Sequence, residues 1–138
     1  MGDNAKIERA NMDGTDNKIL VKAGIQMPTT ITVDPNENKI YWADVMKETV
    51  EMINMDGTGR KVLLSIPNGI WGTISSLAVF EQQVFMSTSG NADTNIKSGI
   101  FACNKTNQYL IGNCSKEITG RLFYSSVKAF GSQYQKKS

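Results

Sequence analysis

Polar and hydrophobic residues alternate along this chain in short runs, and turn-forming residues separate the runs. Thr29–Asp34 alternates along its length and ends at a run of turn formers, Pro35 to Asn38. Lys39–Ala43 is rich in β-branched and aromatic residues, which favour strands. The pattern predicts one up-and-down antiparallel sheet of four short strands, Thr29–Asp34, Lys39–Ala43, Thr49–Asn54 and Arg60–Leu64.

A less regular form of the same pattern occurs on both sides of this unit. The following unit is predicted to hold four strands, Ser76–Phe80, Gln83–Ser87, Gly99–Asn104 and Gln108–Ile111. The preceding one holds only two, Ile7–Met12 and Lys18–Val21, on either side of a turn. One further long strand is predicted over Leu122–Phe130, and no segment has the hydrophobic periodicity of a helix.

An internal repeat underlies this pattern. The run Asn11-Met12-Asp13-Gly14-Thr15 recurs as Asn54-Met55-Asp56-Gly57-Thr58, 43 positions later. Over Lys6–Val21 and Thr49–Leu64, eight of sixteen positions are identical. A period of roughly 40–45 residues favours the four-stranded blades of a propeller. The sequence therefore predicts an all-β fold, a partial β-propeller of four-stranded antiparallel blades.

The predicted propeller segment covers residues 1–132 and holds about two and a half blades. Residues 6–21 are the half blade, 29–65 the complete blade, 74–112 a divergent blade and 120–130 a closing strand; a polar tail covers 133–138. A propeller buries its blade faces by radial repetition, which so short an arc cannot complete. We therefore expect either a fragment of a longer protein or an associating partner, and the remaining blades of its own propeller are one such partner.

Two segments carry a resemblance to a known family. Lys39-Ile40-Tyr41-Trp42-Ala43-Asp44 resembles the Tyr-Trp-Thr-Asp signature of the low-density lipoprotein receptor class B repeat, with Ala43 in place of Thr. Residues 7–15 are similar to the third strand and turn of the same repeat. The third unit departs from it, because Val84-Phe85-Met86-Ser87-Thr88 stands where the signature is expected. The resemblance covers roughly residues 5–112 and implies a propeller of six blades.

This resemblance also implies a function. It indicates an extracellular ligand-binding scaffold of an endocytic low-density lipoprotein receptor-related receptor, at the outer face of the plasma membrane or secreted. Its implied partners are protein ligands, such as lipoproteins or secreted signalling proteins. A Wnt co-receptor and a nidogen-like matrix-binding propeller are the alternatives that stay open.

Composition narrows the class of protein further. The chain has 138 residues, a net charge of +2 and no basic stripe, so nucleic acid is not an expected partner. No apolar stretch approaches the roughly 20 residues of a membrane span, and the N-terminus lacks the apolar region of a signal peptide. There is no histidine, which excludes histidine-based catalysis and Cys/His zinc sites. Since the carboxylates form no obvious pair, we predict no enzyme, no catalytic residue, no metal site and no cofactor.

Candidate binding residues come from loop length. In an up-and-down blade the connections after the second and fourth strands emerge on one side, and here they are the longer ones, Asp44–Glu48, Ser65–Thr73 and Thr88–Ser98. Binding residues gather on such loops. The candidate partner-binding residues are therefore Met46, Lys47, Glu48 and Trp71. Packing between blades is the competing interpretation for both Met46 and Trp71.

The motif residues have a structural interpretation that competes with a binding one. Tyr41, Trp42 and Ala43 are expected to pack between sheets, and Asp44 to satisfy backbone donors at the strand end. The pairs Asp13-Gly14 and Asp56-Gly57 are predicted to be hairpin turns, because a calcium loop needs several oxygen ligands at close spacing.

Two sequons and two cysteines complete the candidates. Asn104-Lys105-Thr106 and Asn113-Cys114-Ser115 make Asn104 and Asn113 candidate glycosylation sites, although so short a pattern also arises by chance. Cys103 and Cys114 are a candidate disulfide. Against it, a hairpin centred near residues 105–107 would place Cys103 opposite residue 108 or 109.

Overall fold

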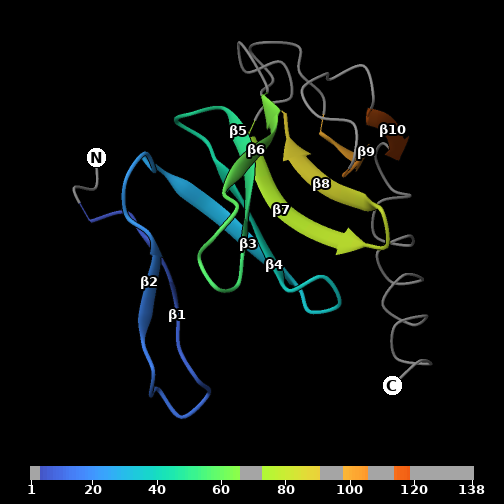
Figure 1. The fold of residues 1–138 in the computed structure, drawn as a ribbon. Helices are drawn as coiled ribbons and strands as arrows, with labels where there is room; N and C mark the ends of the chain where they lie inside the picture. Colours follow the sequence, from blue (N-terminus) through green and yellow to red (C-terminus); the bar gives the residue numbers. More distant parts are fainter. Residues whose placement is uncertain (1–3, 66–72, 91–97, 106–113, 119–138) are drawn as a thin grey trace.

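The computed structural model of the chain describes residues 4–65, 73–90, 98–105 and 114–118 (Figure 1). These residues form three antiparallel sheets, with strand orders β1-β2, β3-β4-β5-β6 and β7-β8-β9-β10. Within them, no helix is long and apolar enough to cross a membrane. The strands are β1 (Ile7–Arg9), β2 (Lys18–Val21), β3 (Pro28–Asp34), β4 (Lys39–Asp44), β5 (Thr49–Asn54), β6 (Lys61–Ser65), β7 (Thr73–Phe80), β8 (Gln83–Ser89), β9 (Gly99–Asn104) and β10 (Cys114–Ile118).

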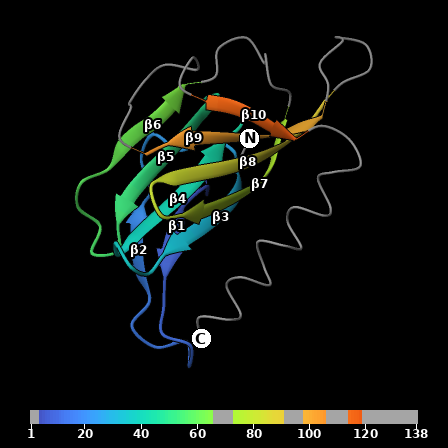
Figure 2. The ribbon, with the colours of Figure 1, turned by 90° about the vertical axis from the view of Figure 1, so that its right-hand side faces the viewer.

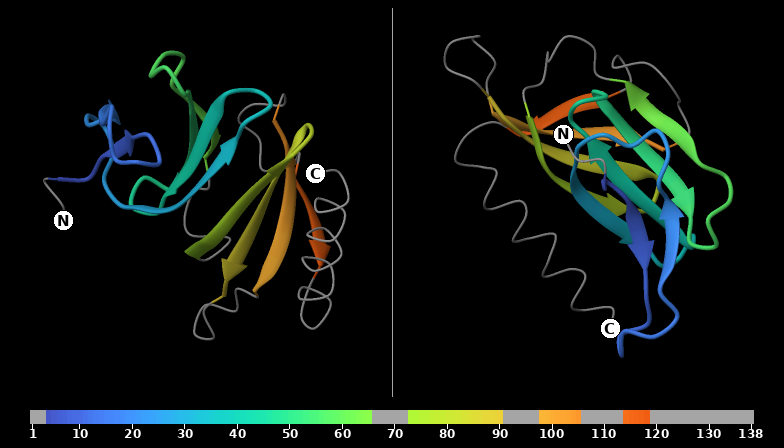
Figure 3. Two further views of the ribbon diagram at one scale, coloured as in Figure 1. Left: turned by 90° about the horizontal axis from the view of Figure 1, so that it is seen from below. Right: turned by 90° about the vertical axis from the view of Figure 1, so that its left-hand side faces the viewer.

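The three sheets stand beside one another in chain order, as in a section of a fan (Figure 3). Strand β3 contacts β7, so the first strands of the two four-stranded sheets lie together. Figure 2 shows the other end of the third sheet, β7–β10, where β10 is the edge strand beside β9. The prediction of a partial β-propeller with four-stranded antiparallel blades is confirmed.

Strand β4 of the central sheet, β3–β6, is buried on both faces. Successive side chains of a strand point to opposite faces. Along β4, Tyr41 and Ala43 therefore join the core shared with β7–β10, while Ile40 and Trp42 join the core shared with β1 and β2. Tyr41, Trp42 and Ala43 have no exposed surface. This double burial explains why β4 is apolar at four consecutive positions instead of at every second one.

Most predicted strands agree with the structure to within three residues at each end. The largest difference in the first half of the chain is β1, which ends at Arg9 and was expected to reach Met12. The reason is that β1 pairs with β2 alone among the described residues, whereas β5, which has the same turn, is held up to Asn54 by its pairing with β4. The chain thus leaves the ladder earlier than the hydrophobic pattern suggests.

The last described strand corrects two predictions. Cys114 of β10 lies directly opposite Cys103 of β9, and a disulfide with a Cα–Cα distance of 4.2 Å joins them. The expected pairing of Cys103 with residue 108 or 109 was wrong, because the connection between β9 and β10 is longer than a tight hairpin. The third sheet also continues to Ile118, past the expected end at 112. The predicted strand Gln108–Ile111, the closing strand at 120–130 and the tail at 133–138 lie outside the described residues.

Candidate functional site

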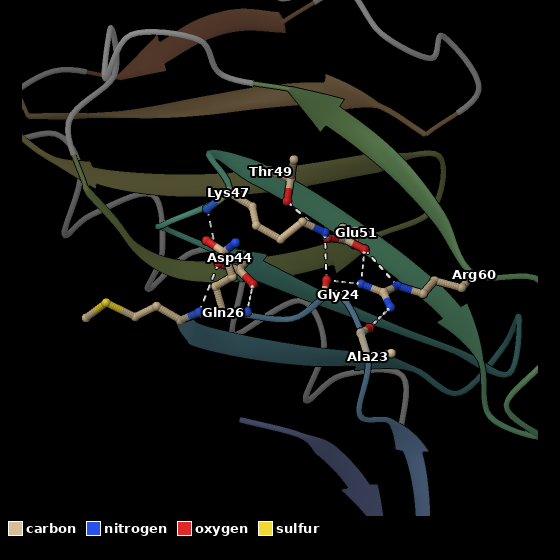
Figure 4. Close-up of polar contacts among 9 residues, drawn as sticks. Ala23, Gly24, Gln26, Asp44, Lys47, Thr49, Glu51 and Arg60 are labelled. Atoms are coloured by element: carbon tan, nitrogen blue, oxygen red, sulfur yellow. Dashed lines mark hydrogen bonds and ion pairs between the residues drawn. The ribbon is translucent and has the colours of Figure 1, made fainter. Parts of the chain in front are cut away.

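The long-loop side of the central sheet is built around the carboxylate of Asp44, at the end of β4. Its Oδ2 accepts a hydrogen bond from the amide of Gln26, at 2.7 Å, and its Oδ1 accepts from the amides of Met27, at 3.0 Å, and Lys47, at 3.2 Å (Figure 4). The Val45 amide also donates to the carbonyl of Met27. Asp44 is only 1% exposed, so its carboxylate joins two chain segments and does not face a ligand.

A buried carboxylate, Glu51 on β5, lies beside this anchor. One oxygen accepts from the ammonium of Lys47 and from the Thr49 hydroxyl, at 3.1 Å. The other accepts from Nε of Arg60, at 2.9 Å. The Glu51 side chain is 2% exposed, whereas those of Lys47 and Arg60 are 25% and 28% exposed. A buried charge needs such partners, because it has lost its hydration.

The two cations continue this network into the connection between β2 and β3. The guanidinium of Arg60 donates to the carbonyls of Ala23 and Gly24, and the ammonium of Lys47 donates to the carbonyl of Gly24, at 2.8 Å (Figure 4). The guanidinium also lies 5.5 Å from the centre of the Trp42 ring. The ammonium of Lys47, a predicted partner-binding residue, is therefore bound by groups of the chain itself, and the side chain is only partly exposed.

The remaining loop candidates have different outcomes. Met46 is 55% exposed at the turn after β4, and Glu48 is exposed in the same turn with a φ of 53°. Trp71 lies outside the described residues. The structure adds Met27, 51% exposed, whose carbonyl binds the turn that carries Met46. The sequence signal for Met27 was its place in the connection to the next blade, which is a long-loop position.

The tight-turn side holds a second buried ion cluster. The ammonium of Lys105, after β9, lies 2.6 Å from Oδ2 of Asp34 and 3.4 Å from Oε1 of Glu37, in the turn after β3. The Lys105 amide also donates to the carbonyl of Gln82, at 2.8 Å. These contacts span about seventy positions in sequence and fasten the third sheet to the central one.

Both acids of this cluster have lowered pKa values. Burial by itself would raise the pKa of Asp34, but the hydrogen bonds from Lys105 and from the amides of Glu37 and Asn36 outweigh it and hold the pKa below its usual value. The hydrogen bond from Lys39 is the main cause of the lowered pKa of Glu37, and the charge of Lys105 adds to it. Both carboxylates are therefore charged at neutral pH.

The two sequon asparagines differ in position. Asn104 is half-buried at the end of β9, opposite Gln83. Asn113 lies outside the described residues. Glycosylation at either residue stays a prediction.

Comparisons with known proteins agree with this architecture. The chain is 35% identical to the vitellogenin receptor Yl of Drosophila melanogaster over 104 residues, which is 75% of the chain. It is 28% identical to the vitellogenin receptor of Solenopsis invicta over 123 residues, or 86% of the chain. Over 59 residues, 43% of the chain, it is 46% identical to low-density lipoprotein receptor-related protein 5 of Mus musculus. No family model matches the chain.

A solved structure agrees as well. One chain of a crystal structure of a nidogen/laminin complex superposes with a TM-score of 0.58 and 27% identity, covering 74% of this chain and 37% of that one. The chain is a low-density lipoprotein receptor class B repeat β-propeller segment. It spans only 5% and 6% of the two vitellogenin receptors and 4% of the receptor-related protein.

The two four-stranded sheets differ at the position of the signature aspartate. In the central sheet, Lys39 of β4 pairs with Asp34 on one side and Asn54 on the other. In the third sheet, Gln83 of β8 pairs in the same way with Phe80 and Asn104, so β8 is the counterpart of β4. Counting along the strands from these positions places Met86 at the Trp42 position and Thr88 at the Asp44 position. The Thr88 hydroxyl donates to the carbonyl of Gly99, at 3.5 Å, where Asp44 accepts from three amides. The divergent class B repeat therefore lacks the carboxylate anchor.

Proposed function

We propose that this chain is part of the ligand-binding propeller of an extracellular receptor of the endocytic low-density lipoprotein receptor-related type, and that its ligand is a protein. Three of the relatives are named as receptors or receptor-related proteins, and two of these matches cover three quarters or more of the chain. The disulfide between Cys103 and Cys114 supports the extracellular location, because disulfides persist in oxidising compartments.

Further strands of the same propeller are part of the proposal. Ile31 and Val33 are 53% and 49% exposed on β3. They lie opposite Trp42 and Ile40, so they share the face that β1 and β2 cover only in part. Among the described residues β1 pairs with β2 alone, whereas its repeat counterpart β5 pairs on both sides. We propose that the two inner strands of a preceding blade complete this face.

The observation that carries the binding proposal is the exposed pair Met27 and Met46 on an anchored loop face. Three hydrogen bonds to Asp44 hold the two loops together. Apolar side chains on a preorganised surface suit protein recognition, because ordering the loops costs little on binding. Methionine is enriched at protein interfaces and adapts to different partners.

Binding measurements with purified proteins test the proposal. The chain would be immobilised and exposed to vitellogenin, with laminin and a Wnt protein as the probes for the two alternatives. In the double variant Met27→Gln/Met46→Gln we expect roughly tenfold weaker binding, as for the loss of central interface contacts. Met12→Gln is the matched control, because Met12 is fully exposed at the tip of the β1–β2 turn, on the tight-turn side.

Each outcome has a definite meaning. Vitellogenin binding that depends on Met27 and Met46 supports the endocytic assignment. Binding of laminin or Wnt in its place favours the corresponding alternative. Equal losses in the double variant and in Met12→Gln, or no binding of any of the three probes, would contradict the proposed binding face.

A further inference from the structure

A pocket of about 380 Å³ opens on the tight-turn side, between the central sheet and the third sheet. Met52 forms its apolar wall. Its polar lining consists of Glu37, Lys39, Tyr41, Lys61, Gln82 and Lys105. This pocket is on the side of the molecule opposite to the long loops, so it is separate from the binding face proposed above.

The hydroxyl group of Tyr41 is the unusual feature of the pocket. The Tyr41 side chain has no exposed surface, and among the described residues its hydroxyl has no hydrogen-bond partner. Buried polar groups without a partner are rare in proteins. Burial, together with the charges of Glu37 and Asp34, raises the pKa of Tyr41, so the hydroxyl keeps its proton and is a donor. The pocket thus has a donor that lacks an acceptor.

One cation of the pocket, Lys61, is in a position to pair with an anionic acceptor. The lining holds three ammonium groups and one carboxylate. Lys105 and Lys39 are paired with the acids Asp34 and Glu37, which leaves Lys61 without an ion-pair partner in the described part of the chain. The lining and Asp34 together carry one net positive charge, which matches a ligand with a single negative charge.

The two available donors lie on the same sheet face. Tyr41, Met52 and Lys61 are successive partners across β4, β5 and β6. Adjacent strands are about 4.8 Å apart, so the backbones at Tyr41 and Lys61 are separated by roughly 10 Å across the Met52 side chain. A ligand lying over Met52 lies between the two donors, and it reaches the buried hydroxyl after a small movement of the side chains that cover it.

We propose that this pocket binds a carboxylate group, with the Tyr41 hydroxyl and the Lys61 ammonium as its donors. The carboxylate can belong to a free organic acid or to an acidic side chain of a protein. Both sources present the same two acceptor oxygens, and the experiment below separates them.

The 138-residue chain, labelled with ¹⁵N, would be titrated with succinate monomethyl ester at constant ionic strength. Backbone amides at Gln82 and Lys61 would report on the pocket. We expect saturable shifts, and roughly tenfold weaker binding in Tyr41→Phe and in Lys61→Gln, since each loses one hydrogen bond to a charged group. Lys22→Gln is the matched control, because Lys22 is an exposed lysine in the connection between β2 and β3.

Tyr41→Phe is suited to this test because it keeps the buried ring and removes only a hydroxyl without a described partner. It should fold, and its thermal unfolding would be measured in parallel. If Tyr41→Phe and Lys61→Gln bind as the unchanged chain does, or if the shifts never saturate, the proposal is overturned. Tighter binding of sulfate than of the monoester would also overturn the assignment to carboxylates.

A second titration identifies the source of the carboxylate. The probe is a short peptide with blocked ends and one glutamate, and its glutamine counterpart is the control. Tighter binding of the glutamate peptide than of the monoester supports a protein side chain as the ligand, whereas the reverse supports a free acid. Equal binding of the glutamate and glutamine peptides would contradict recognition of a carboxylate side chain.

Discussion

The hairpins β1–β2 and β5–β6 have the same turn but differ in burial. In the first, the Thr15 amide and hydroxyl donate to Asp13 at 2.9 and 2.7 Å; in the second, those of Thr58 donate to Asp56 at 2.8 and 2.6 Å. The hydroxyl hydrogen bond is the main cause of the lowered pKa of both aspartates. The Asp-Gly turns predicted from the sequence are therefore present in both copies.

The ladders match as well. Ile7 pairs with Val21 as Val50 pairs with Leu64, and the register shifts immediately after Ile7 and after Val50. Eight identities in sixteen positions thus reproduce the turn and the irregularity of the pairing. The shape of this hairpin is a local property of the repeat.

The two hairpins differ in the burial of their equivalent glutamates, Glu51 and Glu8. The Glu51 side chain is 2% exposed and pairs with two cations, whereas its counterpart Glu8 is 31% exposed and pairs with Lys6 at 2.7 Å. The positions that correspond to Lys47 and Arg60 hold Asn4 and Asn17. The comparison teaches that the two cations beside Glu51, and the β2–β3 connection that they bind, decide whether this glutamate is a structural or a surface group.

The largest expected effect comes from removing each glutamate. Glu51→Ala leaves two cations without their buried partner and should lower the free energy of unfolding by about 3 kcal/mol, the lower end for a broken buried pair because both cations are partly solvated. Glu8→Ala removes a surface pair and should cost about 0.5 kcal/mol or less. Urea unfolding of both variants measures the difference.

The control for this comparison is Asn17→Arg, which gives the first hairpin the counterpart of Arg60. We expect a gain of at most about 0.5 kcal/mol, since the new ion pair would form in water. A gain as large as the loss in Glu51→Ala would show that the cation alone, and not burial, distinguishes the two hairpins.

The next prediction concerns the ion cluster of Lys105, which fastens the third sheet to the central one. Asp34 and Glu37 have lowered pKa values, so their pairing with Lys105 stabilises the fold above the usual carboxyl pKa of about 4 and is lost as the pH falls through the lowered values. Unfolding measured by urea should show no loss from this cluster between pH 7 and 5. Its contribution should decline below about pH 4.

Lys105→Met tests the cause of this decline. Without the ammonium the stabilisation from pairing is absent, so the variant should be less stable at neutral pH, and its loss of stability below pH 4 should be smaller than in the unchanged chain. An acid loss of the same size in Lys105→Met would assign it to other carboxylates.

The smallest effect should be shared by both hairpins. Thr15→Ala and Thr58→Ala each remove the hydroxyl bound to the turn aspartate and should cost about 1 kcal/mol locally. Hydrogen exchange at the Asn11 and Asn54 amides, which donate to the carbonyls of Thr15 and Thr58, should accelerate roughly fivefold in each. A large effect in one hairpin only would contradict the conclusion that the turn is local.

Much of the fold follows from contacts that are close in sequence. The turn at Asp56-Gly57 needs residues that lie within five positions, and Gly57 supplies the positive φ of 93° that this turn requires. The alternation within strands and the spacing of the repeat lead from there to four-stranded blades. The sequence by itself therefore determined the class, the strand order and the side on which each connection lies.

Only the tertiary structure decided which residues meet across long separations. Cys103 meets Cys114 because of the register of β10, which the turn predicted at residues 105–107 did not give. Lys47 is held by Glu51, and Lys105 lies between two acids that are about seventy residues away. The same side chain can lie at the surface or in a buried ion cluster, as Glu8 and Glu51 show, because burial depends on what packs around it.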